Sequence, residues 1–134
     1  MATINKFEEL EIWQLSRKFY KSLSPVIEIL KNNKEYRFAE QMRSASGSVM
    51  DNIAEGFERS SRLEFLNSLG ISKGEVGEIK SQLYRCLDNN YINSEEFNAL
   101  YGEADILSRK IASFIIYLNS AEHKGLKFKD RLKS

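Results

Sequence analysis

The sequence predicts an all-α fold, specifically an antiparallel up-down-up-down four-helix bundle. Three observations predict it: apolar residues recur every three or four positions along four segments, short polar stretches separate these segments, and there is one proline among 134 residues. Helices joined by short connections pack as antiparallel neighbours. We expect one domain over residues 1–122, with helices at about 6–31, 35–57, 61–88 and 94–121, and a basic tail over residues 123–134.

The first two helices are predicted from their apolar stripes. The first stripe consists of Phe7, Leu10, Trp13, Phe19, Leu23, Val26 and Leu30. Within it, Ser24-Pro25 predicts a kink or a restart, because proline lacks the N–H that a helix interior needs. The second stripe consists of Phe38, Met42, Ala45, Val49, Ile53 and Phe57, and Gly56 lies near its end.

The third and fourth helices also carry start signals. Ser61 and Glu64 have the spacing of a capping box, and the third pattern ends at Asp88-Asn89-Asn90. Ser94 is the expected N-cap of the fourth helix. The fourth helix has a seam with alternating spacings of three and four, made of Phe97, Leu100, Ala104, Leu107, Ile111, Phe114 and Leu118.

Charge and cysteine content limit the compartment and the partners. The formal net charge is +1, but the tail carries five cations, namely Lys124, Lys127, Lys129, Arg131 and Lys133, against Asp130. Such a tail can attract phosphates or be a solvated chain end. The single Cys86 cannot form an internal disulfide, which favours the cytoplasm. We expect no signal peptide and no membrane span.

A polar stripe runs along the second helix beside its apolar stripe. Its members are Gln41, Ser48, Asn52, Glu55 and Arg59. Groups in that position should be partly buried, and buried polar groups need hydrogen-bond partners. We expect a network with another helix or another subunit, while a ligand site and simple solvation remain alternatives.

Three glycines share one face of the third helix. Gly70, Gly74 and Gly77, together with Ser81, interrupt a helix in which each glycine costs about 1 kcal/mol relative to alanine. We expect close packing, within or between chains, that offsets this cost. If the second and third helices pair around their turn, Gly74 should lie near Ala45. Exposure to solvent, or room for a ligand, is the alternative.

Catalytic, metal and cofactor sites are not expected. The only histidine is His123, so the Glu-x-x-His pairs of di-iron bundles are missing. Cys86 lies in an apolar register and is expected to pack in the core. Glu75 and Glu78 are one turn apart, as on many helix surfaces. A small-molecule or metal site at Gln41, Asn52, Glu55 and Glu78 remains a third possibility, which predicts a closed pocket containing all four.

Residues 35–57 resemble the signature of bacterial four-helix-bundle proteins encoded by 23S ribosomal RNA intervening sequences. Asn52-Ile53-Ala54-Glu55-Gly56 is the most specific part. Arg59, Glu64-Phe65-Leu66, Gly74-Glu75-Val76 and Glu78 continue the likeness. Two departures are Asn33-Lys34, where the family has Phe-Pro, and Ser44, where it has alanine.

The resemblance implies an antiparallel bundle that assembles as a homopentamer without enzymatic activity; some related bundles bind nucleic acid. The leading hypothesis is a non-enzymatic homo-oligomer that associates with ribosomal or other RNA, or with a nucleic-acid-binding protein. Its phosphate contacts would be Arg43, Arg59, Arg62, Lys124, Lys127, Lys129, Arg131 and Lys133. The alternative is a protein-interaction scaffold, which dispersed basic residues would favour.

Overall fold

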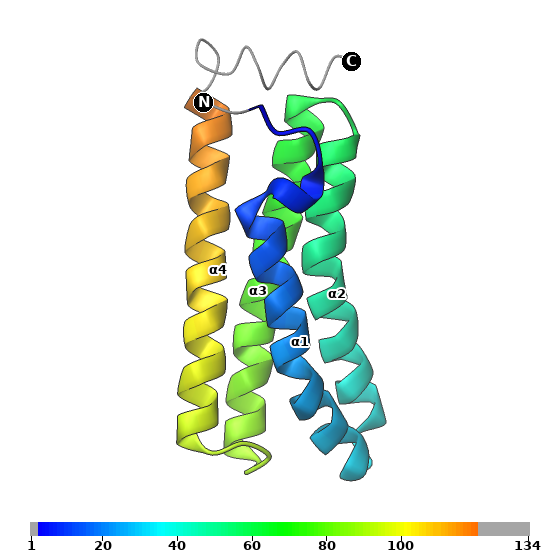
Figure 1. The fold of residues 1–134 in the computed structure, drawn as a ribbon. Helices are drawn as coiled ribbons and strands as arrows, with labels where there is room; N and C mark the ends of the chain where they lie inside the picture. Colours follow the sequence, from blue (N-terminus) through cyan, green and yellow to red (C-terminus); the bar gives the residue numbers. More distant parts are fainter. Residues whose placement is uncertain (1–2, 121–134) are drawn as a thin grey trace.

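The computed structural model describes residues 3–120, which fold into four α-helices and a short 3-10 helix (Figure 1). The α-helices are α1 (Glu11–Asn32), α2 (Tyr36–Glu58), α3 (Arg62–Asp88) and α4 (Ser94–Ser120), and the 3-10 helix is η1 (Phe7–Glu9). The predicted all-α fold is confirmed. The tail predicted at 123–134 lies outside the described residues.

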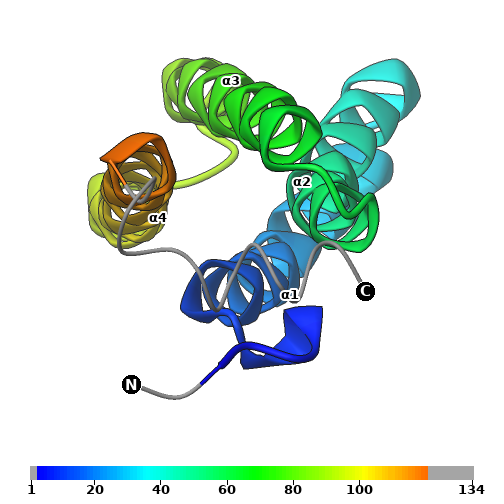
Figure 2. The same cartoon turned by 90° about the horizontal axis from the view of Figure 1, so that it is seen from above.

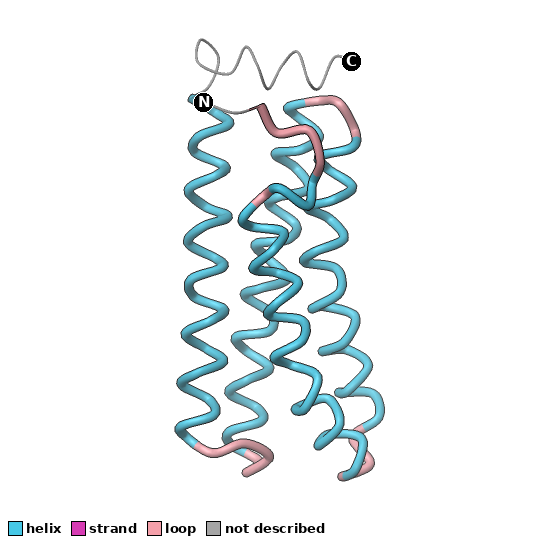
Figure 3. The backbone as a smooth tube through the Cα atoms, viewed as in Figure 1, coloured by secondary structure: helices cyan, strands magenta, loops and turns pink. Residues whose placement is uncertain are grey.

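Consecutive helices run in opposite directions and surround one core (Figures 1 and 2). Contacts between distant residues establish the arrangement. Arg62 at the start of α3 reaches Leu118 near the end of α4, and further along α3 Lys80 pairs with Asp105. Residue numbers therefore rise along one helix as they fall along the other. The α1–α2 and α3–α4 connections lie at one end of the bundle, and the α2–α3 connection lies at the other end (Figure 3).

The core is built from the predicted apolar stripes. Six of the seven seam residues of α4 are buried, and Phe114 is partly buried against the same core. Leu23, Met42, Ile53 and Leu83 contribute fully buried side chains from the other three helices. Burial of a large apolar side chain stabilises the fold by about 1.5–3 kcal/mol, so these stripes fix which face of each helix points inward.

The closest approach between α2 and α3 lies near their connecting turn. A Cβ atom added at Gly56 would lie 2.6 Å from the Cβ of Ser68 and 3.0 Å from Cδ1 of Phe65. One helical turn further from the connection, the Ser72 hydroxyl donates a hydrogen bond to the Val49 carbonyl at 2.8 Å. This pair of contacts sets the register of the two helices.

The first helix differs from the expectation in two respects. It begins at Glu11 rather than residue 6, because Leu10 adopts an extended backbone between η1 and α1. The break lets η1 fold back, so that Phe7 and Trp13 pack edge to face with ring centroids 5.0 Å apart. The helix also continues through Pro25 without a restart.

The predicted cap of α3 is confirmed, whereas that of α4 is wrong by one residue: Asn93 rather than Ser94 accepts a hydrogen bond, from the Glu96 N–H at 2.8 Å, because α4 already begins at Ser94. The Ser61 hydroxyl accepts a hydrogen bond from the Glu64 N–H at 3.2 Å, as the capping-box spacing predicts. The ends of α1 and α3 use left-handed residues, Lys34 with φ 62° and Asn90 with φ 60°. In each case the next N–H bonds to a carbonyl five residues back, as in a Schellman motif.

Candidate functional site

The polar stripe of α2 divides into a half-buried centre and exposed ends. The Asn52 side-chain amide donates to the carbonyl and to the hydroxyl of Ser48, both at 2.9 Å. Both residues are partly buried, whereas Gln41, Glu55 and Arg59 are exposed. The two hydrogen bonds of Asn52 to Ser48 run along α2 and do not cross to another helix.

At the C-terminal end of α2, the stripe joins an ionic cluster that spans the turn between α2 and α3. Arg59 lies 3.4 Å from a carboxylate oxygen of Glu55 and 3.1 Å from one of Glu64. Hydrogen bonding to Glu55 and the charges of both carboxylates raise the pKa of Arg59, which holds the guanidinium in its charged form. All three side chains are about half exposed, so the cluster orders a turn more than it stabilises the fold.

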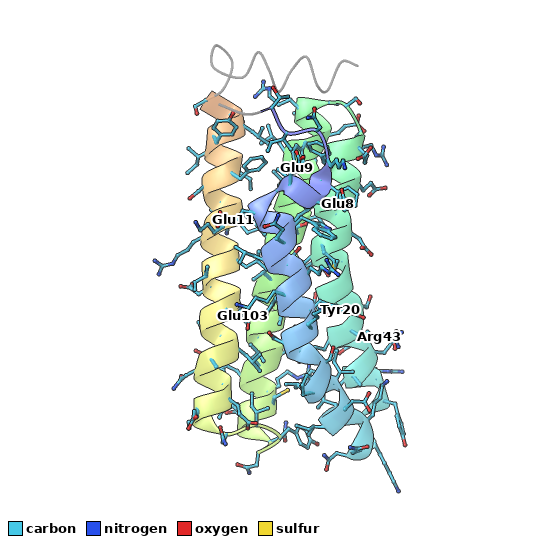
Figure 4. All side chains as sticks on the ribbon, viewed as in Figure 1. Glu8, Glu9, Glu11, Tyr20, Arg43 and Glu103 are labelled. Carbon is cyan, nitrogen blue, oxygen red and sulfur yellow. The ribbon has the colours of Figure 1, made fainter. Side chains whose placement is uncertain are left out.

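Within residues 3–120, each of the three arginines predicted to contact nucleic acid has a partner within the chain. Arg43, on the lower half of α2 in Figure 4, lies 3.9 Å from Glu40. Arg62 donates to the Leu118 carbonyl at 3.0 Å. Arg43 and Arg59 are separated by about 24 Å along α2 at ~1.5 Å per residue. The described arginines are therefore dispersed, and the predicted cations of residues 124–133 lie outside the described part.

The glycine face of α3 is open. Gly70, Gly74 and Gly77 are exposed, and a Cβ added at any of them would have no atom within 4 Å outside the surrounding helix. This differs from the expected contact of Gly74 with Ala45. Leu69, Val76 and Ile79 occupy the opposite face and point into the core. The apolar residues, rather than the glycines, therefore determine which face of α3 points into the core.

Exposed apolar side chains accompany these glycines. Leu63 is 69% exposed and Ile71 is 54% exposed on the outer side of α3. We call the outer residues of this helix the α3 strip, and it consists of Leu63, Gly70, Ile71, Gly74, Gly77 and Ser81. None of these six residues is charged, although the exposed Lys73 and Glu78 flank the glycines. The strip is narrow where the glycines lie, so that another backbone can approach it closely.

The closed pocket predicted for a small-molecule or metal site is not formed. Gln41 and Glu78 line an open hollow between α2 and α3, but Asn52 and Glu55 do not reach it. Asn52 is roughly 16 Å from Gln41 along the helix. Within residues 3–120, no three His, Cys, Asp or Glu side chains are grouped so that they could hold a metal ion.

One carboxyl group in this hollow has a raised pKa. Partial burial, and then the charge of Glu78, raise the pKa of Glu75. Glu78 accepts a hydrogen bond from the Gln82 side-chain amide at 3.1 Å, while the Gln82 side-chain oxygen is buried without a partner. Gln82 was not predicted to be buried, because a polar residue in the apolar periodicity of α3 looks like a surface residue.

Cys86 packs in the core, as its apolar register predicts. It is fully buried, and burial raises the pKa of its thiol to about 11. A nucleophilic cysteine requires the thiolate near neutral pH, and this environment disfavours it. None of the described helices is long and apolar enough to cross a bilayer.

A second open surface lies between the start of α1 and the C-terminal half of α4. Ile4, Leu10, Ile106, Phe114 and Tyr117 give it apolar walls, and its volume is about 620 Å³. This groove was not predicted from the sequence. Its one available signal was Ile106, an apolar residue outside the buried seam of α4 and 55% exposed.

These features define the class as a small up-and-down four-helix bundle whose distinctive polar and glycine residues lie on outer helix faces. The model of the 23S rRNA-intervening sequence protein family matches residues 8–113, and the chain belongs to that family. This confirms the resemblance seen in residues 35–57. A search of curated proteins found no match.

A solved structure has the same fold. It is a protein with unknown function from the S23 ribosomal protein family of Bacteroides thetaiotaomicron VPI-5482. The TM-score is 0.74 at 24% sequence identity, and the match covers 78% of this chain and 97% of that chain. At this identity the likeness supports the fold alone.

Proposed function

We propose that this protein is a non-enzymatic scaffold that assembles with copies of itself through the α3 strip. The single observation that carries the proposal is the open row of glycines at Gly70, Gly74 and Gly77 on an otherwise regular helix. Together they cost about 3 kcal/mol of helix propensity, at ~1 kcal/mol each. Packing inside the chain does not offset that cost, whereas close contact with a second copy would.

The composition of the α3 strip supports a protein partner. Interface cores are depleted in charge and enriched in large apolar residues, and the strip combines open glycines with exposed Leu63 and Ile71. Small residues let two helix backbones approach closely, which increases dispersion contacts along the whole crossing. The family resemblance implies five copies, and we retain a homopentamer in the cytoplasm as part of the proposal.

The proposal contains no catalytic step. The one thiol is buried with a raised pKa, and the polar residues on α2 bond mainly to each other. In an active site, the catalytic groups converge on a concave pocket. The hollow at Glu75 and Glu78 is open by comparison.

Light scattering on the full chain tests self-assembly. We expect a mass that is a multiple of 15.5 kDa, and five times that value for the pentamer. Gly74→Gln should reduce the mass because its side chain would occupy the strip. Gly102→Gln is the matched control, since Gly102 also has open space around a Cβ but lies on α4. A monomeric native chain, or equal masses for both variants, would contradict the proposal.

Association with RNA is a second candidate, favoured by one observation. Arg59 and Arg62 lie at the end of the bundle where α4 finishes, because Arg62 bonds to Leu118. The basic segment that starts two residues after Glu122 therefore follows directly from that end. Arg59 and Arg62 therefore lie at the end of the bundle from which the sequence continues to the five cations of residues 124–133, whereas Arg43 is remote from that end.

A salt-series titration of the full chain with structured RNA tests this candidate. Each phosphate contact contributes about 0.7–0.9 to the slope of log affinity against log salt. The variant Lys127→Gln with Lys129→Gln should lower that slope, whereas Lys31→Gln with Lys34→Gln, at the opposite end, should not. Equal slopes for both variants, or no binding at ~50 mM salt, would leave the scaffold as the proposed function.

A further inference from the structure

The groove between α1 and α4 is an apolar surface that the proposed assembly through α3 does not use. Ile4 and Leu10 form one wall, and Ile106, Phe114 and Tyr117 form the other. Its volume of about 620 Å³ falls within the roughly 300–1,000 Å³ of ordinary ligand sites. Ile106 exposes more than half of its surface there, which is costly for an isoleucine beside other apolar groups.

The edges of the groove carry opposite charges. Glu9 and Glu11 line the α1 edge, where Figure 4 labels them, and Arg109 and Lys110 line the α4 edge. Lys110 already pairs with Glu11 at 3.3 Å, and Arg109 pairs with Asp105 at 2.9 Å. The α1 edge therefore offers the carboxylates of Glu9 and Glu11.

The end of α4 lies beside this groove. Tyr117 is part of the wall, and α4 ends three residues later at Ser120. The chain continues for fourteen residues after Ser120, in which Leu126 and Phe128 are the large apolar residues nearest to the helix. Lys124, Lys127 and Lys129 alternate with them.

The available length is sufficient for the segment to return over the groove. From Ser120 to Ile106, the path back along α4 is about 21 Å at ~1.5 Å per residue. Eight residues of extended chain, from 121 to 128, reach roughly 26 Å at ~3.3 Å per residue.

From these observations we infer that the chain's own C-terminal segment, residues 124–132, docks in the groove between α1 and α4. Leu126 and Phe128 cover Ile106, Phe114 and Tyr117, and the neighbouring lysines face the carboxylates of the α1 edge. The docking buries apolar surface on both partners and pairs a segment of formal charge +3 with the acidic edge. The inference does not depend on self-assembly through α3.

Photo-crosslinking in the full chain tests the inference. Phe128→benzoylphenylalanine keeps an aromatic group at the predicted contact, and irradiation followed by mass spectrometry of peptides locates the bonds formed. We expect crosslinks to Ile4, Ile106 or Tyr117 within a band of single-chain mass on a denaturing gel. Ile106→Lys should abolish most of the crosslinking yet leave the circular dichroism unchanged, because Ile106 is exposed and lies outside the core.

A second reporter distinguishes docking from random collision. Benzoylphenylalanine placed at Ser134, beyond the proposed segment, should crosslink to the groove much less than the same group at position 128. Crosslinks at the α3 strip, crosslinks only between two chains, equal yields at positions 128 and 134, or no crosslink in the groove would each overturn the inference.

Discussion

Replacing Gly56 with alanine tests the closest contact between two helices of the bundle. The new methyl group would lie 2.6 Å from the Cβ and 2.9 Å from the Oγ of Ser68, and 3.0 Å from the Phe65 ring. A Cβ atom moves only with its backbone, and Phe65 is fully buried and packs edge to face on Phe57. Relief of the clash therefore requires α2 and α3 to separate.

The expected magnitude follows from two opposing effects. Overpacking a core costs about 1–3 kcal/mol, and the upper part of that range applies because the neighbours cannot rotate away. Alanine regains about 1 kcal/mol of helix propensity relative to glycine. The net loss in free energy of unfolding should be about 1–2 kcal/mol, which we would measure by urea denaturation at one fixed protein concentration.

Gly102→Ala is the control for this experiment. Gly102 is also a helical glycine, but no atom lies within 4 Å of a Cβ added there. We expect this variant to gain about 0.5–1 kcal/mol from propensity alone. If Gly56→Ala proved as stable as Gly102→Ala, the close approach of α2 and α3 would not exist in solution.

Three further predictions concern capping, charge and reactivity. Ser61→Ala removes the acceptor for the Glu64 N–H and should lower the free energy of unfolding by about 1 kcal/mol, measured by urea denaturation, whereas Ser61→Asp should retain most of it. Hydrogen bonding to Lys80, and then the charge of Arg109, lower the pKa of Asp105. A carboxyl group with a lowered folded-state pKa stabilises the fold above its unfolded pKa of about 3.9 and loses that contribution as pH falls through the folded value. The stability advantage of the native chain over Asp105→Asn should therefore be constant near neutral pH and shrink below about pH 4; an advantage that grew on acidification would contradict this. Burial raises the pKa of the Cys86 thiol to about 11. A thiol reagent at pH 8 should then react with Cys86 more than about 100-fold more slowly in the native chain than in guanidinium, and comparable rates would contradict the buried placement.

Helix boundaries and the core could be predicted from the sequence because they depend on local rules. The seam of α4, the cap at Ser61 and the ends at Lys34 and Asn90 follow from periodicity and chain chemistry in short windows. The start of α1 could not be predicted in this way. Leu10 takes an extended conformation, and Phe7 of η1 packs on Trp13 of α1 across this break, a contact that the local pattern does not reveal.

The expected role of the α3 glycines was wrong within the chain because two patterns competed for one helix face. The sequence places Gly70, Gly74 and Gly77 on nearly the opposite side of the helix from Leu69 and Val76. Both sets cannot face α2. Burying the apolar set gains a few kcal/mol per large side chain, whereas close packing of glycines recovers about 1 kcal/mol each. The glycine needed for close approach was Gly56, at the end of the apolar stripe of α2.

The structural contacts of Arg62 limit how an RNA-binding role can be tested. Its guanidinium bonds to the Leu118 carbonyl in the last turn of α4. A cation at this position also opposes the negative end of the helix dipole. Arg62→Ala would therefore loosen the end of α4 whether or not RNA binds, and weaker RNA binding by that variant would not identify a contact. Lys127 and Lys129 are better probes because their replacement leaves this bond in place.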